Sequence, residues 1–157
     1  MFYHSTRSTL SPVDSAQAVL EGLAPDGGLY MPERLPAFDW QACLKGTSQE
    51  MSAAIVSAFL PDIPHMPQLV RRAYTGKFET EDLTPAVPVG AYHVLELFRG
   101  PTSAFKDVAL CMLPQLMSKA LSGTGKRVMI VTATSGDTGK AALNGFRDVK
   151  DVAITVF

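Results

Sequence analysis

The sequence is short of both cysteine and charge. Only two of its 157 residues are cysteines, Cys43 and Cys111, and they form neither a CxxC pair nor a disulfide framework. Such sparing use of cysteine is typical of a reducing compartment, so we expect a cytoplasmic protein. Lysine and arginine number 14 against 15 aspartates and glutamates, a net charge of -1. We therefore expect no nucleic-acid partner, because no basic field is available.

Long hydrophobic runs and targeting signals are also missing. The longest apolar stretches, residues 128–131 and 152–157, are far shorter than the roughly 18 residues of a membrane-spanning helix. The first ten residues lack the charged-then-apolar layout of a secretory signal. The three histidines lie far apart and near no cluster of acidic or cysteine ligands. We expect neither a membrane partner nor a metal site.

What is present is enough apolar material for a core. Hydrophobic residues make up 46% of the chain and charged residues 18%, which excludes a solvated disordered chain. The pattern changes near residue 84, and we expect a mostly helical segment over residues 1–84 and the first part of an α/β domain over residues 85–157. The sheet of such a domain normally continues further, so we expect the front piece of a longer protein.

Residues 1–84 carry three apolar stripes of helical period. The Ser-Pro pair at residues 11–12 predicts a helix start, and that helix is expected to end at Gly22. Thr47 and Glu50 form a capping box in front of a second stripe. A third stripe covers residues 66–74. These stripes predict faces that pack into the core.

Residues 85–157 alternate between strand and helix patterns. We expect a strand at 92–97, a helix at 104–121, a fully buried strand at 127–133, a helix at 138–147 and a last strand at 152–157. This order predicts an incomplete parallel sheet of the Rossmann-like, three-layer αβα kind. The last strand would expose an apolar edge, so self-association through the sheet is expected.

The strand-to-helix transition at residues 96–107 contains the first candidate site. A Gly-Pro pair makes the turn, and Thr102 or Ser103 can cap the following helix. Lys106 would then lie in the first helical turn, at the carboxyl end of a strand, where open α/β sheets bind ligands. The positive charge of a lysine is unfavourable there, because the start of a helix carries a positive partial charge. The lysine is easier to explain if its amine is neutral or forms a Schiff base. Spacing alone also fits a solvated lysine without chemistry.

The second candidate site follows the strand at 127–133. Four small or polar residues lie between that strand and the next helix, and a fifth begins the helix: Thr134, Ser135, Gly136, Asp137 and Thr138. Backbone N–H groups, hydroxyls and the positive end of a helix dipole converge there, which favours a phosphate or a carboxylate. A P-loop is excluded, because GxxxxGK[ST] needs a glycine in place of Thr134 and a hydroxyl in place of Ala141. A capped turn without a ligand also fits the spacing.

In this order, the segments resemble the N-terminal part of the threonine synthase family, in its longer branch. The resemblance rests on Ser-Thr-Arg at residues 5–7, GLAPDGGLY at 22–30, ELF, GPT and AFKD within 96–107, and ATSGDTG at 133–139. It spans almost the whole chain. It implies the fold of fold-type-II pyridoxal phosphate enzymes and a carbon–oxygen lyase acting on phosphates. The reaction implied is the conversion of O-phospho-L-homoserine and water to L-threonine and phosphate, by β,γ-elimination and β-addition.

The resemblance also implies roles for individual residues. Lys106 would bind pyridoxal phosphate as a Schiff base and later move protons, while Phe105 and Asp137 would lie against the cofactor. Substrate binding is implied for Thr134, Ser135, Gly136, Thr138 and, for the substrate phosphate, Arg7. No second glycine-rich loop occurs before residue 157, so we expect the 157 residues alone to bind the cofactor weakly and to be inactive.

Two departures and two alternatives accompany the resemblance. Arg99 stands where the family usually has histidine, which could alter the edge of the substrate pocket, and Ser8 stands where it usually has glycine. A related lyase would release a 2-oxo acid by simple elimination instead of threonine. A non-catalytic binding or assembly module that keeps the motifs is the second alternative.

Overall fold

The structure is a computed structural model that describes residues 1–7, 10–134 and 136–157. Its helices and strands alternate along the chain in this order: β1 Phe2–Ser5, β2 Val13–Asp14, α1 Ser15–Glu21, β3 Tyr30–Pro32, α2 Trp40–Cys43, α3 Ser48–Phe59, α4 Met66–Tyr74, β4 Ala86–Val89, β5 Tyr92–Leu95, α5 Asp107–Leu121, β6 Val128–Thr132, α6 Asp137–Phe146 and β7 Val152–Val156. Within the described residues, no helix has both the length and the apolar character needed to cross a membrane.

The chain begins with a small antiparallel sheet that the sequence patterns do not predict. Its strand order is β2-β1-β3, and Tyr3 of β1 pairs with Val13 of β2. The helix predicted from residues 11–12 begins later, because β2 continues the sheet through Asp14 and the Asp14 carboxylate then accepts the Gln17 N–H as the cap of α1. Gly22 ends the helix as predicted, with φ +70°.

Helices α3 and α4 form where predicted, but only the stripe of α4 is the predicted core face, because α3 turns Ala53 and Val56 to the core and leaves Ala54 of its predicted stripe exposed. Thr47 and Glu50 form the capping box of α3, with hydrogen bonds in both directions. Helix α4 buries the predicted apolar residues, which are Met66, Leu69, Val70, Ala73 and Tyr74. They share a core with Cys111, Met112 and Leu116 of α5, so α4 and α5 pack directly on one another.

The strand predicted at 92–97 is not part of the parallel sheet. Strand β5 pairs antiparallel with β4 in a hairpin, with Val89 opposite Tyr92 and a two-residue turn at Gly90-Ala91 between them. Both strands of this hairpin are solvent-exposed. Pairing with the preceding segment closes a much shorter loop than pairing with β6 would, and Gly90 supplies the positive φ, +60°, that a two-residue hairpin turn needs.

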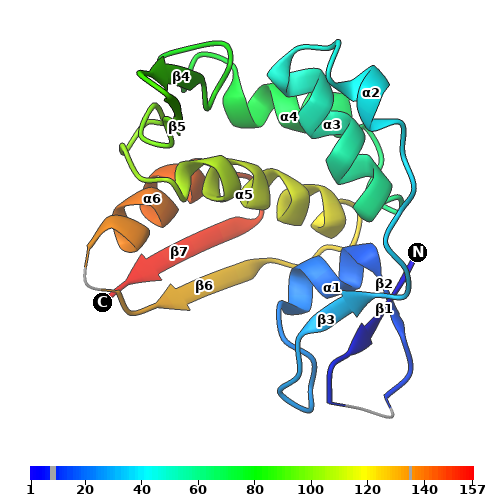
Figure 1. Ribbon diagram of the computed structural model, residues 1–157. Helices are drawn as coiled ribbons and strands as arrows, with labels where there is room; N and C mark the ends of the chain where they lie inside the picture. Colours follow the sequence, from blue (N-terminus) through cyan, green and yellow to red (C-terminus); the bar gives the residue numbers. More distant parts are fainter. Residues whose placement is uncertain (8–9, 135) are drawn as a thin grey trace.

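The parallel sheet contains β6 and β7 in the described part of the chain. Residues Val128 and Thr132 pair with Val152 and Val156, and the helices α5 and α6 cover one face (Figure 1). On the opposite face, Met129 is 59% exposed. The strand predicted to be fully buried is therefore buried on one face only, because no described element covers the other.

Candidate active site

The turn before α5 holds the candidate lysine. Lys106 occupies the N-cap position, and the helix starts at Asp107, three residues later than predicted. Neither Thr102 nor Ser103 caps the helix as predicted, since no side chain bonds to its first N–H groups. The Thr102 hydroxyl instead donates to the Asp107 carboxylate at 2.7 Å, and the Ser103 backbone is left-handed, with φ +59°.

Asp107 and Thr102 form a buried pair of hydrogen bonds, which we call the clasp. One carboxylate oxygen accepts the Thr102 backbone N–H at 2.8 Å, and the other accepts the Thr102 hydroxyl at 2.7 Å. Asp107 is 1% exposed and Thr102 is 8% exposed. A Cβ added to Gly100 would lie 2.5 Å from the Asp107 Cβ, so the turn requires glycine at that position. The sequence patterns do not predict the clasp.

The Lys106 side chain lies in a more open environment than its neighbour Asp107. Its Nζ is 4.1 Å from the centroid of the Phe105 ring, and that ring is 60% exposed. Among the residues that the structure describes, no carboxylate forms an ion pair with this amine. A cation–π contact at an exposed ring is weak, so the amine is free to react with an aldehyde and Phe105 is free to cover a planar ring.

The second candidate site lies at the start of α6, as predicted. The Thr134 hydroxyl accepts the backbone N–H groups of Gly136 at 3.3 Å and Gly139 at 3.1 Å, which fixes the turn in front of the helix. Asp137 is the first helical residue and is exposed, while Thr138 is half-buried. Ser135 lies outside the described residues. The first-turn N–H groups of a helix have no intrahelical partner, so this turn can bind an anion.

The fold brings these two turns to the same end of the parallel sheet. Helices α5 and α6 both start at the end where the arrows of β6 and β7 point (Figure 1). The two helices are packed together, because a Cβ at Gly145 of α6 would overlap the Leu110 carbonyl of α5. This contact joins the last turn of α6 to the first turn of α5. Lys106 and Thr138 both lie at helix starts at the carboxyl end of the strands, where α/β folds bind ligands.

Arg7 is not brought to that end. It follows β1 in the antiparallel sheet, where its backbone N–H donates to the Ser5 hydroxyl at 3.2 Å and its guanidinium lies beside Gly27. The end of β1 is well separated from the starts of α5 and α6 in the view of Figure 1. Within the described residues, Arg7 therefore belongs to a different surface from Lys106.

Arg99 forms a bridge between two glutamates. Its guanidinium lies 2.8 Å from the carboxylate of Glu79, which follows α4, and 2.8 Å from that of Glu96, which follows β5. Hydrogen bonds to Glu79 and then to Glu96 raise the pKa of Arg99. The charge at this position thus serves to tie two loops together. Glu96 is three residues from Arg99 in the sequence, whereas Glu79 is brought to Arg99 by the fold.

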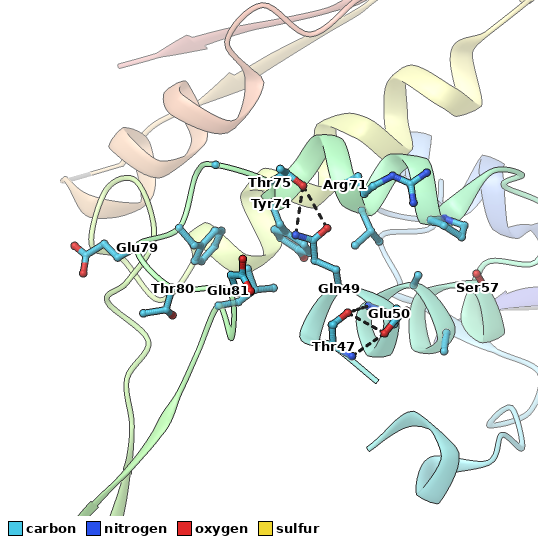
Figure 2. A pocket seen from close by; sticks show the side chains of 17 residues that line it. Thr47, Gln49, Glu50, Ser57, Arg71, Tyr74, Thr75, Glu79, Thr80 and Glu81 are labelled. Carbon is cyan, nitrogen blue, oxygen red and sulfur yellow. Dashed lines mark hydrogen bonds between the residues drawn. The ribbon is translucent and has the colours of Figure 1, made fainter. Parts of the chain in front are cut away.

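A separate cavity of about 780 Å³ lies between α3, α4 and the loop that follows α4. Figure 2 shows Tyr74 at its centre and the capping box of Thr47 and Glu50 at one side. The Tyr74 hydroxyl donates to the Val108 carbonyl oxygen at 2.9 Å, and burial raises the pKa of Tyr74 to about 12. No residue predicted for the active site lines this cavity, so its size does not make it the catalytic pocket.

Comparisons with known proteins point to one family by sequence and by fold. A family model described as the threonine synthase N terminus matches residues 2–74. A threonine synthase of Saccharomyces cerevisiae is 38% identical over 98% of this chain and 34% of its own length, and one of Pseudomonas aeruginosa is 37% identical over 99% and 34%. The crystal structure of a PLP-bound threonine synthase from Brucella melitensis superposes with a TM-score of 0.91 at 39% identity.

These matches cover nearly all of this chain but only about one third of each relative. The Brucella melitensis structure matches 99% of this chain, but the chain covers 35% of that structure. A yeast threonine synthase structure gives the same picture, with a TM-score of 0.87, 36% identity and coverage of 99% and 35%. The chain has the α/β fold of these enzymes, and it belongs to the threonine synthase family, spanning about one third of the length of its relatives.

Proposed function

We propose that the full-length protein is a pyridoxal-phosphate-dependent threonine synthase that converts O-phosphohomoserine and water to threonine and phosphate. The observation that carries the proposal is the turn at Lys106, in a chain that resembles a PLP-bound threonine synthase with a TM-score of 0.91. Lys106 is half-buried at a helix start, and among the described residues no carboxylate pairs with its amine. That environment fits a lysine that binds an aldehyde cofactor covalently.

The residues around the two turns suggest how cofactor and substrate are held. Phe105 would cover the cofactor ring beside Lys106, and Asp137 would lie near a ring oxygen at the start of α6. We assign the substrate carboxylate to the anion-binding turn, which contains Thr134, Ser135, Gly136 and Thr138. Arg7 remains a proposed ligand of the substrate phosphate only if further parts of the protein bring that surface to the site.

The chemistry requires groups that move protons at fixed positions. The cofactor, when bound, supplies an electron sink that makes the Cα proton of the substrate acidic. The Lys106 amine would be the group that accepts and returns protons at the substrate carbons. The turn of α6 holds the carboxylate, so that these carbons stay within reach of Lys106.

The test is product analysis with the full-length protein. O-Phosphohomoserine and pyridoxal phosphate should yield threonine and phosphate in equal amounts. Lys106→Ala should abolish both products, whereas Lys126→Ala, at an exposed lysine in the loop after α5, should leave them unchanged. A 2-oxo acid in place of threonine would favour the simple elimination, and the absence of any product from folded protein would favour a non-catalytic module.

A further inference from the structure

Backbone hydrogen bonds surround Lys106 on both sides. Its carbonyl oxygen accepts the Leu110 N–H at 2.8 Å, and the Asp107 N–H donates to the Ala104 carbonyl oxygen at 3.0 Å. These bonds fix the lysine relative to the first turn of α5. Further back in the loop, the Ser103 N–H donates to the Gly100 carbonyl oxygen at 3.1 Å, and Ser103 has a left-handed conformation that costs free energy in a residue other than glycine.

The clasp is a second connection between the loop and the helix, made by side-chain atoms of Asp107. The Asp107 carboxylate has one oxygen bonded to the Thr102 N–H and the other to the Thr102 hydroxyl. Hydrogen bonds to a charged group are stronger than neutral ones, and exclusion of water strengthens them further. Because the Gly100 backbone lies directly against Asp107, the loop and the first helical residue form one packed unit.

We propose that Asp107 and Thr102 are positioning residues, which hold the backbone of Lys106 so that its amine meets the aldehyde of the cofactor. This proposal rests on the proposed function, because it assigns the clasp to the same lysine. Asp107 is buried and bonded to Thr102, whereas the Lys106 amine lies over the exposed Phe105 ring. The carboxylate therefore acts through the backbone and not as a charge partner of the amine.

Three substitutions separate hydrogen bonding from charge and from size. Thr102→Val keeps the shape of the side chain but leaves one buried carboxylate oxygen without its donor. Thr102→Ser restores the hydroxyl. Asp107→Asn removes the charge but can keep both hydrogen bonds, because its amide can donate to the Thr102 hydroxyl while its oxygen accepts the backbone N–H.

The measurement is the rate at which pyridoxal phosphate, trapped by cyanoborohydride, labels Lys106 in the full-length protein. Peptide mass spectrometry follows Lys106 and uses exposed Lys126 as the internal control. We expect Thr102→Val to label Lys106 about tenfold more slowly, and Thr102→Ser and Asp107→Asn to stay within about twofold of the wild type. Labelling of Lys126 should not change.

The outcomes of this experiment distinguish failure of the clasp proposal from failure of the proposed function. Wild-type labelling on another lysine would overturn both. Labelling of Lys106 at the wild-type rate in Thr102→Val would overturn the clasp proposal and leave the proposed function standing. If Thr102→Val does not fold, Thr102→Ala, which also removes the hydroxyl donor, takes its place with the same expected loss, and a wild-type rate in it overturns the clasp proposal. Slow labelling in Asp107→Asn assigns the effect to charge and also overturns the proposal.

Discussion

Lys106 and Asp107 are neighbours in the sequence and have opposite environments. The lysine amine lies beside an exposed aromatic ring, and the aspartate is sealed from solvent with Thr102. A buried charge is tolerated only when it is hydrogen-bonded, so the clasp gives Asp107 a structural reason to be inside. The reactive and the structural role are thus divided between two consecutive side chains.

Ser15 is the residue for which a change in stability is easiest to predict. Its side chain is fully buried, and its hydroxyl donates to Asp62 at 2.7 Å, which joins the start of α1 to the loop after α3. Ser15→Ala should lower the free energy of unfolding by about 1 kcal/mol. Urea unfolding measures this, with Ser118→Ala in α5 as the control at a half-buried helical serine.

The same contact predicts a dependence on pH. The hydrogen bond from the Ser15 hydroxyl is the main cause that lowers the pKa of Asp62 below its ordinary value of 3.8. A carboxyl with a lowered pKa stabilises the folded state above the unfolded-state pKa, and this is lost as pH falls through the folded value. The difference between wild type and Ser15→Ala should therefore be constant above about pH 5 and shrink below pH 3.8. A difference that grows in acid would contradict this assignment.

The sequence predicts some of these residues and not others, for a physical reason. The position of Lys106 follows from local turn chemistry and from the family motif, both of which involve adjacent residues. The pairing of Arg99 with Glu79 joins segments 20 residues apart, and side-chain contacts over such a distance leave no periodic pattern. The clasp spans five residues, but the sequence does not predict it, because a threonine in front of a helix is typical of a helix cap.

Among the elements, the contact between α5 and α6 sets the geometry of the candidate site. Gly145 allows the backbone of α6 to approach the Leu110 carbonyl of α5. Leu110 is one helical turn after Lys106, so the same contact helps to place the lysine turn relative to the anion-binding turn. Glycine is unfavourable inside a helix, and this close approach explains its presence.

Gly145→Ala should therefore disturb both helices. The added methyl group overlaps backbone, and we expect a loss of about 2 kcal/mol or more, which exceeds the gain of about 1 kcal/mol in helix propensity. Lys140→Ala, at an exposed position of the same helix, should have little effect. Urea unfolding followed by circular dichroism compares the two variants, and equal stabilities would show that α5 and α6 do not pack as described.

The elements differ in how well their patterns predict them. Helix α3 is predictable from its capping box and helix α4 from its apolar stripe, because both signals are local. Strand β5 was predicted, but its partner was not, since the sequence of a strand does not specify which edge it joins. Strands β1, β2 and β3 are two to four residues long, too short to show an alternation.

At the scale of the whole molecule, exposed apolar side chains occur in several regions, and one of these regions is the open face of the parallel sheet. Val131 is 66% exposed and Met129 is 59% exposed, while the other face of β6 packs against the helices. The hairpin of β4 and β5 adds further exposed apolar residues. Exposed apolar sheet faces favour association, and the relatives are about three times as long as this chain.

Residues 1–157 produced alone should therefore self-associate. Light scattering should show an average mass that rises with concentration, and Val131→Lys should shift the equilibrium toward the monomer by placing a charge on the open face. Ser122→Lys, in the exposed loop after α5, is the matched control and should not change the mass. A monomer at every concentration would show that the open face does not drive association.

The central claim is that Lys106 is the residue that binds the cofactor. Borohydride reduction of the full-length protein with pyridoxal phosphate, followed by peptide mass mapping, tests it directly. The account predicts a single reduced pyridoxyl group on the peptide that contains Lys106, and its loss in Lys106→Ala. A label on Lys77, Lys119 or Lys126, with Lys106 unmodified, would contradict the account.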